Sequence, residues 1–480
     1  MLKLQPYDYS IIMERRNFLK SSSLALVGAG LFKSASAEAI IANQPSANGT
    51  AKNIIFLVSD GMSVGTLTMA NLFLQRKEGR NSHWMQLYND NLVRRALMDT
   101  ASASSLVTDS AAASSSWGGG VRVKNGSLNV NADGSFNKPI LQKFKAAGKS
   151  VGCVTSVPVA HATPAGFCVN NNKRGDMQQI AADYLKLRFD VMMGGGTELF
   201  SANKRADKRD LFKEFVDAGF TVVQNRNQML NIKSVNTKPV LGIFNTTSIP
   251  YALDRENDAE LKERTPTLAE MSKAAISHLS KNKKGFVLQI EGGKVDWAAH
   301  ANDAGALVYD QVAFDDAIKV AMDFAKTNKD TLVIITTDHG NANPGLFYGA
   351  NADKNFERLQ NFKHTNDWVL MGINRNFSVA QVIERLEAAQ GYAINNEEAK
   401  EILSHYNKLD ESGVYNSYKL PFNALANTQQ KYIAVGWGST DHSGDHVELA
   451  MSGPGSTMLK PFVKNYELHN FMLNAAGVKV

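Results

Sequence analysis

The sequence has few cysteines, no large excess of one charge and no long hydrophobic run after its start, and each lack excludes a class of protein. Its two cysteines in 480 residues, Cys153 and Cys168, lack the closely spaced Cys or His neighbours of a cysteine-based structural zinc site. The formal charge is +6, and residues 1–37 contribute half of it. No Lys/Arg run is interleaved with aromatic residues, so nucleic acid is not an expected partner. After those first residues, no apolar run has the length of a membrane helix.

Residues 1–37 have the features of an export signal. Arg15 and Arg16 precede the apolar run "LALVGAGLF", and "SASA" offers a small-residue cleavage site after Ala37. This arrangement resembles a twin-arginine signal, the route for proteins that are exported after folding. Because the apolar run is too short to span a bilayer comfortably, we expect cleavage rather than an uncleaved anchor. The sequence therefore predicts a periplasmic or secreted protein.

Export has consequences for the mature chain. We expect residues 38–51 to form a flexible segment, and Met13 is an alternative start of translation. Cys153 and Cys168 would enter an oxidising compartment, where such a pair either forms a disulfide or remains as two small buried residues. Their spacing along the chain does not decide between these alternatives, because a disulfide depends on local geometry.

Short apolar runs alternate with helical patterns along the mature chain. The runs end in Gly, Asp, Ser or Glu and lie at 53–61, 150–157, 189–196, 285–293 and 331–340. Uninterrupted apolar runs of this length are typical of strands buried on both faces of a parallel sheet. Helical periodicity occurs at 138–149 and 307–328. We predict an α/β fold with a large, doubly wound, mostly parallel central sheet and helices on both faces. Two later strands are expected at 431–439 and 447–455.

Two regions interrupt this alternation. Residues 225–265 mix turn residues with few periodic signals, and residues 341–430 form a long insertion with a helical portion at 378–407. We interpret the insertion as an excursion from the sheet within one domain that spans residues 52–480.

Carboxylates and imidazoles follow several predicted strands. They are Asp60, Glu291, Asp296, His300, Asp338 and His339, joined near the C-terminus by Asp441, His442, Asp445 and His446 of "STDHSGDH". Side chains at the carboxyl ends of parallel strands converge in such a fold, and an i, i+4 pair shares one helix face. A single His after a strand is usually a packing residue, and a single Asp there usually caps a helix. These structural explanations are weakened here because each would have to apply independently at four strand ends. Mixed Asp and His ligands favour zinc, whereas Glu, Thr and Asp oxygens favour magnesium.

The segment "LVTDSAAASSSWGGG", residues 106–120, has the composition of a flexible linker. A spacer would not be expected to carry Leu106, Val107 and Trp117 at its ends. Ser110 precedes an Ala/Ser-rich stretch able to form a helix, and the N-terminus of a helix favours an anion such as phosphate. A serine hydroxyl is a weak nucleophile until it is activated. Because the sequence contains neither a Ser-His-Asp arrangement nor a G-x-S-x-G elbow, a metal is the expected activator.

Six motifs in one order resemble those of bacterial alkaline phosphatases: "DGM", "TDSAA", "HATPAG", "EGGKVDWAAH", "TTDHG" and "DHSG". The resemblance spans about residues 52–456. It implies two zinc ions with a nearby magnesium, and a serine that is transiently phosphorylated while phosphate monoesters are hydrolysed to an alcohol and inorganic phosphate.

Transferred position by position, the resemblance assigns each motif a role. Ser110 becomes the nucleophile, and Arg174, eleven residues after Thr163, becomes the residue that binds phosphate oxygens through its planar fork. The implied ligands are Asp296, His300 and His442 for one zinc; Asp60, Asp338, His339 and Ser110 for the other; and Asp60, Thr163 and Glu291 for magnesium.

The sequence departs from the best-known enterobacterial members at two substrate-binding positions. It has His161 and Trp297 where they carry Asp and Lys, and in this it resembles other members, including marine and cold-active ones. We expect His161 in or next to the magnesium shell, and the loss of Lys removes a cation near the phosphate. After His339, "GNANPG" also differs from common versions. In this family long insertions form a crown over the site or contact a second subunit, so a homodimer is expected.

Several other functions fit parts of this pattern. A phosphodiesterase or phosphonate hydrolase of the same superfamily shares the two-metal core, but Arg174 and the magnesium set favour a monoesterase. A phosphosugar mutase is disfavoured because an exported mutase lacks an obvious pool of phosphorylated metabolites. A non-catalytic exported zinc-binding protein explains the ligands but gives no reason for Ser110.

Overall fold

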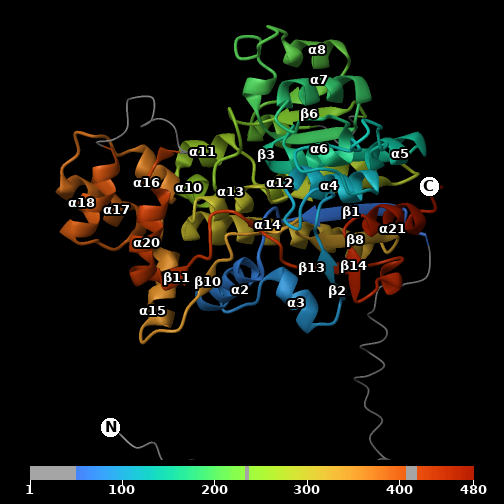
Figure 1. The fold of residues 1–480 in the computed structure, drawn as a ribbon. Helices are drawn as coiled ribbons and strands as arrows, with labels where there is room; N and C mark the ends of the chain where they lie inside the picture. The colour runs from blue at the N-terminus through green and yellow to red at the C-terminus, as the bar shows by residue number, and fades with distance from the viewer. Residues whose placement is uncertain (1–49, 233–236, 407–418, 480) are drawn as a thin grey trace, which may run out of the picture. The chain divides into compact units, whose positions relative to one another are not determined.

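A ten-stranded sheet lies in the middle of the molecule (Figure 1). The computed structural model describes residues 50–232, 237–406 and 419–479. In spatial order the strands are β14 (Phe462–Lys464), β2 (Arg94–Asp99), β13 (Val447–Ser452), β8 (Thr331–Thr336), β1 (Asn53–Val58), β7 (Phe286–Glu291), β3 (Ser150–Pro158), β4 (Val191–Gly195), β6 (Val240–Ile243) and β5 (Thr221–Val223). Neighbouring strands are parallel, except that β13 is antiparallel to β2 and β8. The predicted α/β fold with a large, mostly parallel sheet is confirmed.

The five apolar runs predicted as buried strands form β1, β3, β4, β7 and β8. They are buried along nearly their whole length because helices cover both faces of the sheet. The register aligns their ends: Val58 of β1 lies opposite Glu291 of β7 and Thr336 of β8, and Thr155 of β3 also lies opposite Glu291. Because β1, β3, β7 and β8 are parallel, the residues that follow them emerge at one edge of the sheet.

Alternate residues of the strands contribute to two hydrophobic cores, one on each face, as Leu57 and Phe56 do in β1. The first core includes residues of α2 (Val64–Glu78), α3 (His83–Asn89), α9 (Arg226–Leu230), α10 (Ala252–Asn257), α12 (Leu268–Leu279), α13 (Lys294–His300) and α14 (Ala304–Thr327). The second includes residues of α4 (Ser110–Gly119), α5 (Ile140–Ala146), α6 (Ala162–Cys168), α7 (Met177–Leu187), α8 (Leu211–Asp217) and α21 (Glu467–Ala475). The helical patterns at 138–149 and 307–328 correspond to α5 and α14.

Two short antiparallel ribbons pair the segment that enters the long insertion with the segment that leaves it. In one, β9 (Gly340–Asn341) pairs with β12 (His442–Ser443); in the other, β10 (Gly345–Leu346) pairs with β11 (Val435–Gly436). The described α-helices between β10 and β11 are α15 (Ala352–Glu357), α16 (Asn366–Met371), α17 (Val379–Gln390), α18 (Asn396–Tyr406) and α20 (Phe422–Ile433). These helices add residues to the first core. Figure 1 shows α16, α17, α18 and α20 grouped beside α10 and α11 (Ala259–Arg264). The ribbons return the chain to the sheet edge, where β12 lies against β9.

The prediction of a strand at 431–439 is wrong. Helix α20 continues to Ile433, and only the two residues of β11 pair, outside the central sheet. Leu425 and Ile433 are both buried and lie two turns apart, so Ile433 completes a buried helix face. Ala434 then ends the helix in the left-handed conformation with φ 58°. Residues 225–265, which show few periodic signals, contain β6 and the short helices α9, α10 and α11.

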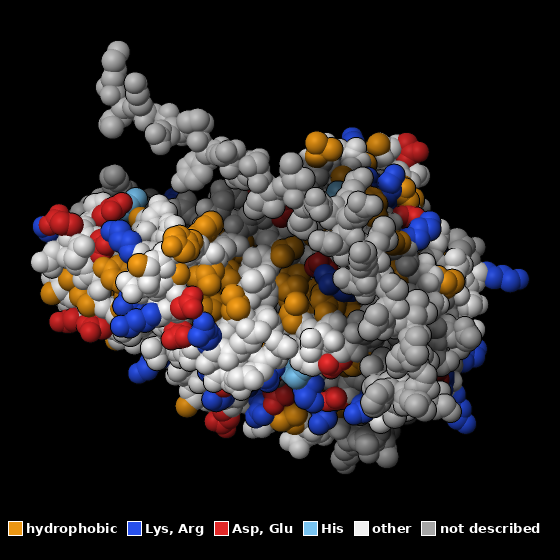
Figure 2. Space-filling view, turned by 90° about the horizontal axis from the view of Figure 1, so that it is seen from below, with side chains coloured by type: hydrophobic (Ala, Val, Ile, Leu, Met, Phe, Trp, Pro, Cys, Tyr) orange, Lys and Arg blue, Asp and Glu red, His pale blue; other side chains and the backbone are white. Residues whose placement is uncertain are grey.

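The predicted signal, residues 1–37, and the predicted flexible segment up to residue 49 lie outside the described residues. In the part of the chain that the structure describes, no helix is both long and apolar enough to cross a membrane. Figure 2 shows one face of the molecule, on which the basic and acidic side chains of the described residues are interspersed.

Candidate metal and phosphate site

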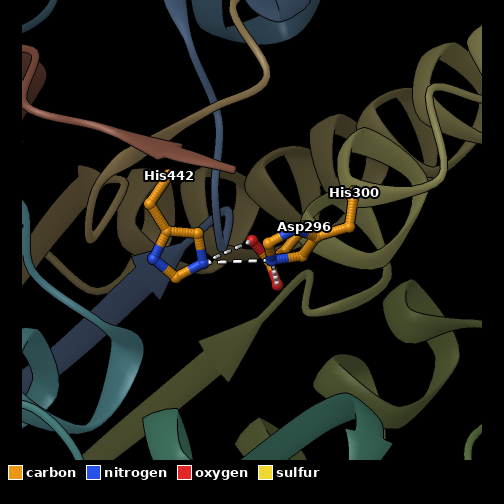
Figure 3. A group of neighbouring side chains, drawn as sticks. All are labelled: Asp296, His300 and His442. Atoms are coloured by element: carbon orange, nitrogen blue, oxygen red, sulfur yellow. Dashed lines mark hydrogen bonds and ion pairs between the residues drawn. The ribbon is translucent and has the colours of Figure 1, made fainter. Parts of the chain in front are cut away.

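Three side chains at the sheet edge converge on one point (Figure 3). Asp296 and His300 lie one turn apart on α13, and His442 comes from β12. Asp296 Oδ2 lies 3.5 Å from His300 Nε2, and Asp296 Oδ1 lies 3.5 Å from His442 Nε2. The two Nε2 atoms are 3.1 Å apart. One carboxylate and two imidazoles at these separations fit a single zinc ion. The His300 side chain is 40% exposed, so this set opens to solvent.

Backbone carbonyl groups orient the histidines of the site. A carbonyl oxygen only accepts hydrogen bonds, so the Nδ1 atom that faces it carries the ring proton and Nε2 keeps a free lone pair. The Nδ1 to carbonyl distances are 2.6 Å from His300 to Thr440, 2.9 Å from His442 to Thr108 and 3.2 Å from His339 to Gly340. All three Nε2 atoms are therefore available as ligands.

A second set lies deeper, where β1 and β8 end. His339 Nε2 is 3.6 Å from Asp60 Oδ1, 3.2 Å from Asp338 Oδ2 and 3.3 Å from the hydroxyl of Ser110. The backbone N–H groups of Gly61 and His339 both donate to Asp338 Oδ1 at 3.0 Å. This leaves Asp338 Oδ2 directed at the imidazole. The second set thus combines two buried carboxylates, one imidazole and one serine hydroxyl.

A third set shares Asp60 with the second. The Thr163 hydroxyl donates to Asp60 Oδ2 at 3.0 Å, and the Thr155 hydroxyl donates to Glu291 Oε2 at 2.5 Å. Asp60, Glu291 and His161 form a group whose ligand atoms are close enough to hold one ion, and His161 Nδ1 is 4.0 Å from Glu291 Oε1. Two carboxylates and a threonine hydroxyl suit magnesium, with His161 at its side.

The chemistry of these atoms fits bound cations. Three buried carboxylate oxygens of these sets lack a hydrogen-bond partner: Asp60 Oδ1, Asp338 Oδ2 and Glu291 Oε1. Burial and the neighbouring carboxylates raise the pKa of Asp60 well above its usual range, and burial and Asp60 do the same to the pKa of Glu291. Burial raises the pKa of Asp338 to about 7. Buried charges of one sign are costly without a counter-charge, so these carboxylates match positive ions between them.

Ser110 stands at the start of a buried helix beside a fixed guanidinium. It is the first residue of α4, and Asp109 caps this helix by accepting the Ala112 N–H through Oδ1 at 2.9 Å. The other oxygen of Asp109 accepts from Arg174 Nη1 at 3.0 Å, and Arg174 Nη2 lies 3.3 Å from His161 Nε2. Burial and Arg174 lower the pKa of His161 to about 3, so its ring is neutral. Arg174, which the resemblance assigns to phosphate binding, is thus held by Asp109 and lies beside His161.

His161 and Trp297 also lie next to each other. Their rings meet edge to face, with centroids 6.1 Å apart and planes inclined by 77°. Trp297 belongs to α13, one residue after Asp296. The two side chains that distinguish this sequence from the enterobacterial members are therefore in contact, and His161 also lies beside Arg174.

Three contributors were not identified from the sequence. Asp109 stands next to Ser110 in the quoted motif, and an Asp just before a helix is a cap signal, but its bond to Arg174 joins distant segments. Asn341 donates through Nδ2 to Asp296 Oδ1 at 2.7 Å, and Thr155 holds Glu291. Neither Asn341 nor Thr155 carries a sequence signal, because each acts on a residue that only the fold brings close.

Other polar residues singled out in the sequence lie apart from these sets. Asp445 accepts from the Ser443 hydroxyl at 3.0 Å, His446 packs edge-on against Phe462, and the side chain of Asp441 is exposed. None of the three belongs to the groups of possible ligands found among the described residues.

The two cysteines, both buried, are free thiols whose Sγ atoms lie 3.7 Å apart. Cys153 belongs to β3, and Cys168 is the last residue of α6. The two thiols therefore pack between this strand and this helix rather than at the site.

Comparisons with known proteins show the family to which the chain is similar. A family model described as alkaline phosphatase matches residues 51–478. Alkaline phosphatase 4 of Bacillus subtilis is 31% identical over 470 residues, which cover 95% of this chain and 96% of that protein. Alkaline phosphatase 3 of the same organism is 32% identical over 425 residues, or 87% of each chain. The crystal structure of Thermus thermophilus alkaline phosphatase is similar with a TM-score of 0.83 and 31% identity, covering 94% of this chain and 96% of that one.

The family model covers most of the chain, the two Bacillus subtilis relatives match over 96% and 87% of their lengths, and the described residues contain groups able to hold metal ions. The chain therefore belongs to the alkaline phosphatase family, whose members are metal-dependent phosphatases.

Proposed function

We propose that this protein is an exported alkaline phosphatase that hydrolyses phosphate monoesters to an alcohol and inorganic phosphate through a phosphoserine at Ser110. The position of Ser110 carries the proposal. Its Oγ lies at the N-terminus of a buried helix, 3.3 Å from His339 Nε2, and Asp109 holds Arg174 nearby. A phosphate placed on this oxygen meets helix N–H groups, a guanidinium and cation ligands together.

The three ligand sets support two zinc ions and one magnesium. We assign Asp296, His300 and His442 to one zinc, Asp60, Asp338, His339 and Ser110 to the second, and Asp60, Thr163 and Glu291 to magnesium, with His161 beside it. When bound, such cations supply Lewis-acid stabilisation of the charge on the serine oxygen, the leaving oxygen and the phosphoryl group.

The residues of the chain bind and orient the substrate. Arg174 presents a planar pair of N–H donors that matches two phosphate oxygens, and its bond to Asp109 fixes the direction of this fork. Neutral His161 accepts from Arg174 through Nε2. Trp297 closes the side of the site next to His161.

The reaction takes place in two displacements at phosphorus. The Ser110 hydroxyl loses its proton, its oxygen bonds to phosphorus and the bond to the alcohol oxygen breaks, so the alcohol leaves with a proton. Water then attacks the phosphoserine, inorganic phosphate is released and the Ser110 hydroxyl is restored. The backbone N–H groups at the start of α4 lie where negative charge develops on the phosphoryl oxygens.

A substrate comparison with the mature protein tests this proposal. With zinc and magnesium supplied at alkaline pH, we expect strong preference for p-nitrophenyl phosphate over bis(p-nitrophenyl) phosphate. Preference for the diester would mean that the protein is a phosphodiesterase with the same metal-binding residues. Arg174 would then lose its proposed role in binding phosphate.

The nucleophile has a matched control in the same helix. Ser110→Ala should lower kcat at least about a thousandfold. Ser116 is equally buried on α4, but its hydroxyl donates to the Ala112 carbonyl at 3.0 Å, so Ser116→Ala should keep nearly full activity. A fully active Ser110→Ala would instead mean that Ser110 is not the nucleophile and that the reaction does not pass through a phosphoserine at this position.

We also propose export and dimerisation. Residues 1–37 support export through a twin-arginine route, and we expect the mature N-terminus to follow Ala37 in periplasmic or secreted protein. N-terminal sequencing measures this, and replacement of Arg15 and Arg16 by Lys should retain the precursor inside the cell. Light scattering of the purified protein measures the expected homodimer.

A further inference from the structure

Lys294 lies buried in the first turn of α13, two residues before Asp296. Its ammonium nitrogen is 3.4 Å from the centre of the Tyr251 ring and 4.7 Å from the centre of the Trp297 ring. It also donates to the Ser248 hydroxyl at 3.3 Å. The cation therefore lies against two aromatic faces, an arrangement that gains energy when it is shielded from water.

The cation restrains a tryptophan that belongs to the site. Trp297 is half-buried, the ammonium lies over its ring, and the ring also makes the edge-to-face contact with His161. An indole held by two contacts loses rotational freedom. Without the cation, the ring has one contact fewer that fixes its orientation.

His161 connects Trp297 to Arg174, the residue proposed to bind phosphate. Its Nε2 lies 3.3 Å from Arg174 Nη2 and its Nδ1 lies 4.0 Å from Glu291 Oε1. Contacts thus run without a break from Lys294 through Trp297 and His161 to the guanidinium.

A hydrogen bond of its backbone and several carboxylates surround Lys294. The backbone N–H of Lys294 donates to the buried Ser156 hydroxyl at 3.0 Å, which ties the start of α13 to β3. Burial lowers the pKa of Lys294, whereas carboxylates of α10, α14, the residue before α14 and the insertion favour its charged form; these are Asp254, Asp310, Asp303 and Asp367. The insertion therefore contributes to the same charge balance through Asp367 of α16.

We infer that Lys294 is a positioning residue for phosphate binding: its ammonium holds Trp297 against His161 and so sets the place at which Arg174 meets the phosphate. The inference rests on the proposed phosphomonoesterase function.

The test compares variants of the zinc- and magnesium-loaded protein. Lys294→Met keeps the length of the side chain and removes its charge, and it should raise both KM for p-nitrophenyl phosphate and the inhibition constant of inorganic phosphate about five- to thirtyfold. The effect on kcat should be smaller, about threefold or less, because Ser110 and its neighbours keep their positions. Lys294→Arg keeps a cation over the rings and should restore most of the affinity.

Lys149 provides the matched control. It is also buried, and its ammonium donates to the carbonyl oxygens of Lys52 and Lys284, which precede β1 and β7 at the opposite edge of the sheet. Lys149→Met should lower the melting temperature without changing KM or phosphate affinity. If Lys294→Met behaves like Lys149→Met, the residue only supports the fold and the inference is overturned.

A double-mutant cycle isolates the contact with the indole. In a Trp297→Leu background, Lys294→Met should have little further effect on phosphate affinity, whereas additive effects would overturn the inference. Trp297→Leu alone should weaken phosphate binding by a similar factor, which tests the same contact if Lys294→Met does not fold. Titration calorimetry with inorganic phosphate measures binding without turnover. Wild-type protein that binds phosphate but lacks monoesterase activity would overturn the proposed function, not the positioning.

Discussion

Asp109 joins two interactions that substitution can separate. Its Oδ1 caps α4 through the Ala112 N–H at 2.9 Å, while its Oδ2 accepts from Arg174 Nη1 at 3.0 Å and from the Gly126 N–H at 2.9 Å. Serine is also a good helix cap but is too short to reach the guanidinium. Asp109→Ser should therefore release Arg174 and keep the cap, whereas Asp109→Ala loses both.

The structure sets the size of each effect. The side chains of Asp109 and Arg174 are 19% and 29% exposed, so their bond is partly shielded from water. Hydrogen bonds to charged groups contribute about 1.5–3 kcal/mol, and a released Arg174 must be ordered again by the phosphate. We expect Asp109→Ser to raise KM and the phosphate inhibition constant about five- to thirtyfold. Loss of the cap in Asp109→Ala should cost about 1 kcal/mol of unfolding free energy in addition.

Steady-state kinetics with p-nitrophenyl phosphate, phosphate inhibition and urea unfolding measure these effects on the same samples. An Arg174→Ala background serves as control, because Asp109→Ser should then change KM little. Wild-type KM and phosphate inhibition in Asp109→Ser would refute the idea that this carboxylate directs the guanidinium.

Three further predictions concern stability and thiol chemistry. Burial lowers the pKa of His442, but the Asp296 carboxylate outweighs burial and raises it to about 9, above the usual 6.5. In metal-free protein the stabilising contribution of His442 should therefore be complete below about pH 6.5 and lost as the pH rises through 9. Urea unfolding after EDTA treatment measures this dependence, which His442→Gln should lack. Gly118→Ala would place a Cβ 2.0 Å from the Gly166 carbonyl oxygen, so α4 and α6 must separate; we expect a loss of about 1–3 kcal/mol by urea unfolding together with lower kcat. Burial raises the pKa of the Cys153 thiol, so Cys153 and Cys168 should react with Ellman's reagent only after unfolding, and two missing thiols in the unfolded chain would reveal a disulfide instead.

The strands of the sheet were predictable because burial on both faces leaves an uninterrupted apolar run. The runs at 53–61 and 331–340 became β1 and β8 for this reason. The same signal misled at 431–439, where a short apolar run ends α20 and Ile433 completes its buried face. A run of that length does not distinguish a buried strand from the end of a helix.

The site was predictable where its spacing is local or its motif is specific. Asp296 and His300 face one way because they lie one turn apart on α13, and Ser110 lies at the start of a helix. The order of the motifs identified the family, which the comparisons show. The bond between Asp109 and Arg174 was not predictable, because it joins side chains from two segments far apart in the chain.

By itself, the sequence determined which segments become strands, which residue types stand at their carboxyl ends, and that Ser110 begins a helix, because these depend on hydrophobic periodicity and capping within a few residues. Only the tertiary structure decided which of these side chains meet. The pairing of β9 with β12 brings His442 beside His339 after a long insertion. The contact of Lys294 with Trp297 and Tyr251, and the approach of Arg174 to His161, likewise depend on how the helices pack. These contacts are set by strand register and core packing across the whole chain, which no local pattern encodes.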